Sequence, residues 1–264
     1  MSGDRGLGGP ARYLARWEMD DVAGAVVVVD VLRAFTSAAY AFGAGARSIH
    51  LVGSVEEALA YKAAHPGVLA MGEDGGRRQA GFDFSNSPVE VADADVRGRD
   101  LVQRTGAGVQ GALAARSADR LWCASLVCAS ATARAVASSR LGTPTYLISG
   151  RFPDVGEHSG SDDLFTAQLI ERARLGLDLA TEATARAVSA SQEADHTLSL
   201  GPPHVHPDDV AFATRIDLFD FAMEVTRSAD GLTLAPTWSG VDASDAGDAG
   251  DAGDAGDAGD VSRS

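Results

Sequence analysis

Lysine and cysteine are scarce in this sequence of 264 residues. Lys62 is its single lysine, which excludes a G-x-x-x-x-G-K-[ST] phosphate-binding loop and leaves no spare lysine for Schiff-base chemistry. Cys123 and Cys128 stand in a largely apolar segment with no histidine nearby. Two cysteines are too few for a disulfide framework or a cysteine-based zinc site, so we predict two small buried apolar side chains.

The sequence also lacks a long hydrophobic run and a secretory signal pattern. Its longest apolar run, residues 22–29, is far too short to span a bilayer. The first residues show no basic segment followed by an apolar one. We therefore expect a cytoplasmic protein with no membrane partner.

The sequence has fewer basic residues (22) than acidic residues (37), and its formal net charge is −15. From Asp242 to the last residue, the segment of repeated Asp-Ala-Gly contains seven aspartates and one arginine, so this tail carries −6 and the rest of the chain −9. A body this acidic would repel phosphate backbones and acidic lipid headgroups, which argues against a nucleic-acid partner. A small anionic substrate stays compatible, because a local cluster of donors can outweigh the average charge.

The composition divides the chain into three expected parts. Residues 1–20 form an N-terminal lead-in, residues 21–240 an α/β domain of one or two lobes, and residues 241–264 a tail. The tail repeat has glycine at every third position but no proline, which excludes a collagen helix. Since the repeat also lacks bulky apolar residues, we predict a disordered tail, and weak calcium binding by its aspartates is the less favoured alternative.

Short apolar runs alternate with alanine-rich helical stretches between about residues 23 and 150. The continuous run Ala25–Val29 is typical of a strand that is covered on both faces. Ser54-Val-Glu-Glu57 has the spacing of a capping box that opens a helix. The alternation predicts an α/β fold, layered α/β/α with a largely parallel or mixed sheet. The expected strands are 25–29, 48–52, 68–71, 101–104, 121–124 and 146–149, and the expected helices 36–44, 54–64, 109–116, 130–139 and 162–175.

Two segments break this rhythm. Residues 72–98 are rich in Gly, Asp, Asn, Ser and Pro. This segment is too long to serve only as a connection between two elements of a compact domain. Residues 207–226 carry apolar side chains at steps of three and four residues, which predicts an amphipathic segment packed on the body. Its expected core positions are Phe212, Ile216, Phe219 and Met223.

Carboxylates follow expected strands at Asp30 and at Gly72-Glu-Asp74, and a third carboxylate group follows the loop after a later strand. Open α/β sheets bind their ligands at such strand ends. Asp30 comes directly after the valine run, with Arg33 three residues later. A carboxylate there can hold a metal or act as a general base and the arginine can bind an anion, but a salt-bridged strand end is equally compatible. Asp162 and Asp163 open a helix after a glycine-rich loop. They either complement the helix dipole or serve as hard oxygen ligands for Mg²⁺.

Two further loops offer hydrogen-bond donors. Asn86 and Ser87 precede a proline on a constrained turn, where simple turn chemistry is the alternative to ligand binding. Thr105-Gly-Ala-Gly108 lies between a strand and a helix, where backbone N–H groups can approach an anion, although such glycine-rich turns are common. If the four places converge, they would suit metal-assisted phosphoryl chemistry.

In its motifs the sequence resembles the 2-phosphosulfolactate phosphatase family over about residues 20–235. The resemblance implies a layered α/β fold and a magnesium-dependent acid phosphatase that converts phosphosulfolactate to sulfolactate and phosphate, on the route to coenzyme M. The segments that carry it are Asp30-Val-Leu-Arg33-Ala, Gly72-Glu73, Gly81-Phe-Asp83 with Asn86-Ser-Pro88, Thr105-x-x-Gly108 and Asp162-Asp163.

The same resemblance implies roles for the candidate residues. Asp30, Asp162 and Asp163 are expected to hold Mg²⁺, and Asp30, Arg33 and Glu73 to act in catalysis by orienting water or binding phosphate. The substrate, a small phosphorylated hydroxy acid, is expected to contact Asn86, Ser87, Thr105 and Gly108. The sequence leaves the oligomeric state open, with a homo-oligomer among the alternatives.

Three positions depart from the usual family pattern. Thr105-Gly-Ala-Gly-Val109 replaces Thr-Thr-Asn-Gly-Thr, Ser161 replaces a glutamate before the aspartate pair, and Ser85 replaces a glycine. The first departure removes an amide and two hydroxyls that would contact the substrate. Two alternatives therefore stay open: a phosphatase of the same fold with a different phosphoester substrate, and a non-catalytic anion-binding protein on the same scaffold.

Overall fold

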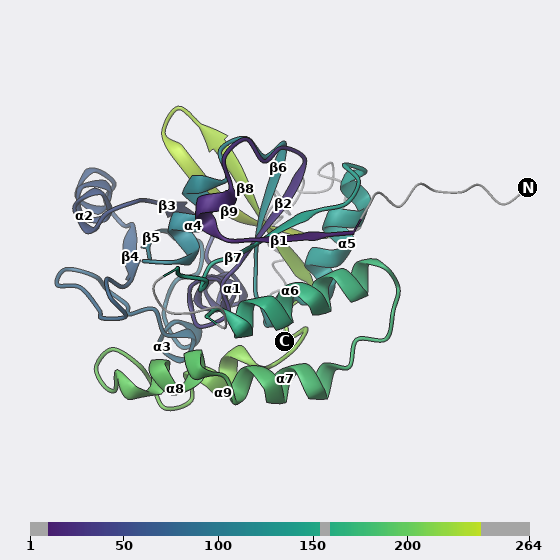
Figure 1. Cartoon of the computed structure of the whole chain (residues 1–264). Coiled ribbons are helices and arrows are strands. Elements are labelled where there is room, and N and C mark those ends of the chain that lie inside the picture. Colours follow the sequence, from purple (N-terminus) through teal and green to yellow (C-terminus); the bar gives the residue numbers. More distant parts are fainter. Residues whose placement is uncertain (1–9, 154–158, 239–264) are drawn as a thin grey trace, which may run out of the picture.

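A computed structural model describes residues 10–153 and 159–238. In these residues the strands form one mixed sheet that is curled like half of a barrel, with helices packed around it (Figure 1). The strands are Arg12–Leu14 (β1), Ala25–Val29 (β2), Ser48–Leu51 (β3), Leu69–Gly72 (β4), Asp100–Arg104 (β5), Arg120–Ala124 (β6), Thr145–Ile148 (β7), Phe221–Ser228 (β8) and Gly231–Trp238 (β9). Their order across the sheet is β1-β7-β2-β6-β8-β9-β3-β5-β4. The predicted α/β class with a mixed sheet is confirmed.

Two parallel blocks make up most of the sheet. One contains β1, β7, β2 and β6, and the other β3, β5 and β4. Strand β2 pairs on both sides, with Val28 opposite Cys123 of β6 and opposite Leu147 of β7. This central position explains the unbroken run of valines, because every side chain of β2 is buried.

A hairpin formed by β8 and β9 joins the two blocks. It runs antiparallel to β6 on one side and to β3 on the other, so the two parallel blocks point in opposite directions. The helical spacing predicted over 207–226 is wrong for most of that segment: only Asp209–Ala213 (α9) is helical, and Phe221–Ser228 is strand. Phe221, Met223 and Val225 pack in one core and Ala222 in the opposite one, as the alternation of side chains along a strand requires. Met223 falls at a position expected to be buried in a helix and also in a strand, so the spacing of apolar residues did not distinguish the two.

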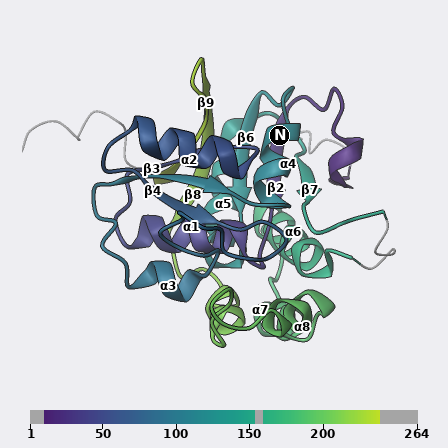
Figure 2. The same cartoon turned by 90° about the vertical axis from the view of Figure 1, so that its left-hand side faces the viewer.

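Helices cover both faces of the sheet, and the alternation along β2 shows how. Val26 and Val28 pack in one core with Ala34–Gly43 (α1) and Gly108–Ala114 (α4). Val27 and Val29 point to the opposite core, which contains residues of Ala129–Ser139 (α5) and Ser161–Arg174 (α6). The predicted layered arrangement is thus present (Figure 2).

The remaining helices lie at the periphery. Val55–Ala64 (α2) packs against β4 and β5 through a third, smaller core, and its predicted capping box is formed by Ser54 and Glu57. Pro88–Ala92 (α3) interrupts the long segment 72–98. Thr181–Ser189 (α7), Gln192–Ser199 (α8) and α9 follow α6 and form a layer below it in Figure 1.

Three other predictions concern the cysteines and the two ends of the chain. Cys123 and Cys128 are free and buried, as predicted. Part of the predicted lead-in, Arg12–Leu14, forms the edge strand β1, while residues 1–9 and the whole predicted disordered tail, 241–264, lie outside the described residues. Over the described ranges, no helix is both long enough and apolar enough to cross a membrane.

Candidate active site

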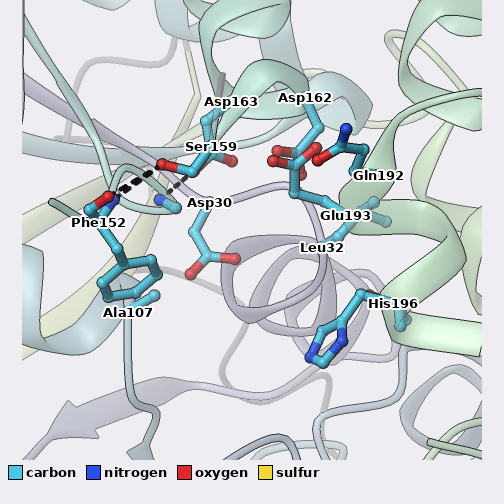
Figure 3. A pocket seen from close by; sticks show the side chains of 12 residues that line it. Asp30, Leu32, Ala107, Phe152, Ser159, Asp162, Asp163, Gln192, Glu193 and His196 are labelled. Carbon is cyan, nitrogen blue, oxygen red and sulfur yellow. Dashed lines mark hydrogen bonds between the residues drawn. The ribbon is translucent and has the colours of Figure 1, made fainter. Parts of the chain in front are cut away.

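A cavity of about 500 Å³ opens where β2 and β7 end, between the first turn of α6 and helix α8 (Figure 3). The predicted carboxylates Asp30, Asp162 and Asp163 all line it. The loop after β5 contributes Ala107, although β5 belongs to the oppositely directed block. The curl of the sheet therefore brings the carboxyl ends of both blocks to one place, and a hydrogen bond of 2.9 Å from Gln103 Nε2 to the Ala34 carbonyl ties them together.

Asp30 is the first residue after β2, and its side chain is almost fully buried. Its Oδ1 accepts a hydrogen bond of 2.8 Å from the backbone N–H of Ala34, at the start of α1. Burial raises the pKa of the Asp30 carboxyl to about 6; the negative charge of Glu73 adds to the rise, and the N–H groups of Ala34 and Gly108 oppose it. A carboxyl group that titrates near neutral pH beside a cavity has the properties of a functional group.

Gly108 makes the close approach between α4 and Asp30 sterically feasible. A Cβ atom at this position would lie 2.6 Å from Asp30 Oδ2 and 2.9 Å from Ala34 Cβ. Both neighbours are buried and bonded to each other, so neither can move away cheaply. The predicted importance of Gly108 thus has a steric basis in addition to its backbone N–H.

We expect Gly108→Ala to destabilise the protein by about 1–3 kcal/mol, because the added methyl group overpacks this contact. Gly106→Ala is the matched control, since its Cβ would meet Glu73 Oε1 at 3.5 Å, an ordinary contact. Urea unfolding monitored by circular dichroism measures both free energies. Equal stabilities of the two variants would contradict the steric account.

Asp163 and Asp162, neighbours in the first turn of α6, have different surroundings. Both carboxylate oxygens of Asp163 accept backbone hydrogen bonds of 2.8 Å, Oδ1 from Val31 and Oδ2 from Gly150. Asp163 therefore joins the loops that follow β2 and β7. Asp162 Oδ1 is equally buried but accepts no hydrogen bond from any described residue.

The acidic cavity raises the pKa of both aspartates. Burial raises the pKa of Asp162 to about 8, with contributions from the charges of Glu193 and Asp30. Burial, followed by the charges of Asp162 and Asp30, raises the pKa of Asp163 well above its usual range. Since an unpartnered buried oxygen and mutual repulsion both carry a free-energy cost, the site is electrostatically prepared for a cation.

Arg33 lies close to Asp30 in sequence, but its guanidinium is held by another part of the chain. Nη1 donates 2.8 Å to Asp209 Oδ2 and 3.0 Å to the carbonyl of His204. Burial lowers the pKa of Arg33, and the carboxylate of Asp209 opposes that change. The salt-bridge alternative considered for Arg33 is therefore realised, with a partner that lies 176 residues away in sequence.

Asn86 and Ser87 lie outside the lining of the acidic cavity, and Ser87 contacts Asp209. Ser87 Oγ donates 2.5 Å to Asp209 Oδ1 and accepts from the N–H of Glu90, so it caps α3 as turn chemistry predicts. Asn86 Oδ1 is buried and without a hydrogen-bond partner among the described residues. Of this pair, only Asn86 retains unused hydrogen-bonding capacity.

The loop Thr105–Gly108 directs its donors and acceptors to groups of the protein itself. Glu73 Oε1 accepts from the N–H of Gly106 at 2.5 Å, and Glu73 Oε2 from the N–H of Gly76 at 2.6 Å. Thr105 Oγ1 accepts from the N–H of Val109 at 3.0 Å. Glu73 thus joins the loop of residues 105–108 to the loop that follows β4. Some of the backbone N–H groups predicted to bind a substrate anion therefore already donate to a carboxylate.

Two groups of site residues were missed from the sequence. Helix α8 contributes Gln192, Glu193, His196 and Thr197 to the cavity wall, and Asp209 pairs with Arg33. The four α8 residues repeat at i, i+1, i+4 and i+5, which marks one face of a helix, but nothing in that spacing indicates that the face meets Asp162. Asp209 carried no local signal, because it does not follow an expected strand.

The carboxylates fit a divalent cation that has few protein ligands. In the described residues, no three His, Cys, Asp or Glu side chains are grouped so that they could hold a metal ion. Mg²⁺ does not require such a group, because it is commonly bound by one or two carboxylates together with water and phosphate oxygens. Asp162 Oδ1, unpartnered and in the cavity lining, and Asp30 are the two side chains here that fit this role.

The fold and the cavity define an α/β protein with a cavity that contains several buried carboxylates at the carboxyl ends of its strands. Its residues 13–228 match the family model described as 2-phosphosulpholactate phosphatase. The chain is 32% identical over 209 residues to the probable 2-phosphosulfolactate phosphatase of Bacillus subtilis, covering 79% of this chain and 90% of the Bacillus protein. The chain belongs to the 2-phosphosulpholactate phosphatase family.

Two further relatives bear the same name. The protein of Thermus thermophilus is 39% identical over 146 residues, which is 55% of this chain and 59% of that protein. The protein of Deinococcus radiodurans is 39% identical over 155 residues, which is 57% of this chain and 62% of that protein. The family resemblance stated from the motifs is therefore confirmed.

Proposed function

We propose that this protein is a phosphoric monoester hydrolase that converts 2-phosphosulfolactate to sulfolactate and phosphate. The observation that carries the proposal is the family match over residues 13–228, which spans the buried carboxylates of the cavity. The names of the relatives, each given as a probable 2-phosphosulfolactate phosphatase, support this choice of substrate. We further propose that the reaction takes place in the cytoplasm and serves the synthesis of coenzyme M.

We propose Mg²⁺ as the cofactor, with Asp30 and Asp162 as its protein ligands. When bound, the cation would neutralise negative charge that develops on the phosphoryl oxygens. Asp163 keeps the loops after β2 and β7 in register, so that Asp30 and Asp162 face one cavity. Glu73 holds the loop of residues 105–108 against Asp30 and thereby completes the wall.

Phosphate release from a panel of phosphorylated hydroxy acids tests the function. We expect turnover of 2-phosphosulfolactate with Mg²⁺ and loss of turnover with a chelator. Turnover of another phosphoester alone would favour the second candidate, a phosphatase of the same fold with a different substrate, which the altered loop Thr105–Val109 supports. No turnover of any compound, together with tight binding of one, would establish a non-catalytic anion-binding protein instead.

Stability in a chelator is expected to fall as the pH rises. The pKa values of Asp30 and Asp162 lie near 6 and 8, above the ordinary carboxyl value, so the folded protein holds protons that the unfolded chain has lost. This contribution to stability is complete below the ordinary carboxyl pKa and is lost as the pH rises through about 6 to 8. Differential scanning calorimetry between pH 5.5 and 8.5 should show Tm decreasing by roughly 5 °C or more.

Mg²⁺ should reverse this loss at pH 8, because a cation can replace the protons, and should have little effect at pH 5.5. Asp162→Asn is the matched variant, and its Tm should depend less on pH. A Tm in chelator that stays level or increases over this range, or the absence of a Mg²⁺ effect at pH 8, would refute the proposed cation site.

A further inference from the structure

Most of the groups predicted to bind the substrate's anions already have acceptors within the protein. Arg33 donates to Asp209, the N–H of Gly106 donates to Glu73, and the N–H of Gly108 faces the Asp30 carboxylate. A polyanionic substrate therefore needs further donors on the cavity wall. A bound cation would serve the phosphoryl group, and the acid groups of the substrate require a partner elsewhere.

Among the described residues that line the cavity, His196 is the one whose side chain can carry a positive charge. The charged groups that face it from α6 and from the end of β2 are all carboxylates, Asp162, Asp163 and Asp30, and its own helix adds Glu193. The imidazole makes no hydrogen bond, ion pair or ring contact with any described residue. Figure 3 shows this ring on the side of the cavity that α8 forms, unpaired among the labelled residues.

Glu193 fixes the position of His196 relative to the aspartates. Its Oε1 accepts 2.6 Å from the N–H of Gly160, and its Oε2 accepts 2.9 Å from Ser161 Oγ. These bonds attach α8 to the first turn of α6, where Asp162 is located. Since residues three apart share one helix face, the anchored Glu193 places His196 toward the same cavity.

We propose that His196 is a specificity-determining residue, whose ring N–H binds an acid group that the substrate carries beyond its phosphoryl group. An imidazole can donate an N–H to a sulfonate or carboxylate in either protonation state, and a protonated ring adds charge attraction. Because the other ionisable side chains that line the cavity are carboxylates, this contact selects phosphoesters that carry a second anionic group. The inference rests on the proposed function for its choice of substrate class.

The test compares wild type with His196→Ala on three phosphoesters in the presence of Mg²⁺. They are 2-phosphosulfolactate, 2-phospholactate, which lacks the sulfonate, and 1-sulfopropan-2-yl phosphate, which lacks the carboxylate. We expect the variant to raise KM for 2-phosphosulfolactate by about 10- to 100-fold with kcat little changed, and to leave KM unchanged for the analogue that lacks the contacted group. Leu198→Ala, on the same helix but exposed and outside the cavity lining, is the matched control and should leave KM within about twofold.

A fall in kcat with unchanged KM on all three esters would overturn the proposal, because it would indicate a role in the chemical step. Binding of sulfolactate, measured by isothermal titration calorimetry, separates this inference from the proposed function. If no ester is turned over but His196→Ala weakens sulfolactate binding at least tenfold, the proposed hydrolysis fails and the role of His196 stands. Equal binding by variant and wild type, or no binding by wild type, overturns the role of His196 whatever the turnover.

Discussion

Asp30→Asn is expected to lower kcat for phosphate release by about a hundredfold to a thousandfold, the size of effect seen when a group that stabilises the transition state is removed. Asparagine has the same size and can still accept the hydrogen bond from Ala34, but it carries no charge for a cation. The amide nitrogen would also meet the N–H of Gly108 as a second donor. Malachite-green assay of phosphate over a range of Mg²⁺ concentrations measures the loss.

The same substitution should not destabilise the fold. Asp30 is buried beside the charges of Glu73, Asp162 and Asp163, so removal of its charge relieves repulsion. We therefore expect a Tm at pH 8 without Mg²⁺ that is equal to or higher than that of wild type. Asp95→Asn, at an exposed aspartate outside the cavity, is the control and should retain full activity. Undiminished turnover in Asp30→Asn would remove Asp30 from the catalytic residues.

Much of the sheet could be predicted because its local patterns have one interpretation. The valine run of β2 is buried on both faces, and the capping box at Ser54 marks the start of α2 unambiguously. The hairpin of β8 and β9 could not be predicted in the same way, since Met223 satisfies both helical and strand periods. The insertion of that hairpin between two parallel blocks depends on contacts with β3 and β6, which local periodicity does not contain.

The candidate site likewise contains residues that the sequence could locate and residues that it could not. Asp30 and the Asp162–Asp163 pair follow strands or open a helix at the cavity, so the rule that ligands bind at strand ends located them. The rule says nothing about pairing between distant loops. Arg33 is paired with Asp209, which lies on α9. The wall opposite the aspartates comes from α8, because α7 and α8 pack beside α6 and α9 packs against α8 in the folded chain. Such pairings are set by tertiary packing, and a single sequence gives no spacing from which to infer them.

Asp209→Ala is expected to destabilise the protein by about 3–5 kcal/mol, the cost of leaving one member of a buried ion pair unpaired. The side chains of Arg33 and Asp209 are 3% and 0% exposed, so water cannot replace the lost partner. The substitution also removes acceptors from Ser87 Oγ and from the N–H of His206. Urea unfolding measures the change in free energy. Asp208→Ala is the control, because the Asp208 side chain is exposed and its one contact with a described residue is a long one of 3.8 Å to His206.

A double-variant comparison separates the unpaired charge from the lost packing. Arg33→Leu combined with Asp209→Leu removes both charges, so it should be more stable than Asp209→Ala although it changes more atoms. The single amide oxygen of Asp209→Asn can accept from Ser87 Oγ or from the N–H of His206 but not from both, so this variant should lie between wild type and Asp209→Ala. If Asp209→Ala were no less stable than Asp208→Ala, the pair would contribute little to the fold. Because Arg33 lies three residues after Asp30, the expected loss instead implies that Asp209, 176 residues further along the chain than Arg33, anchors the loop that carries Asp30.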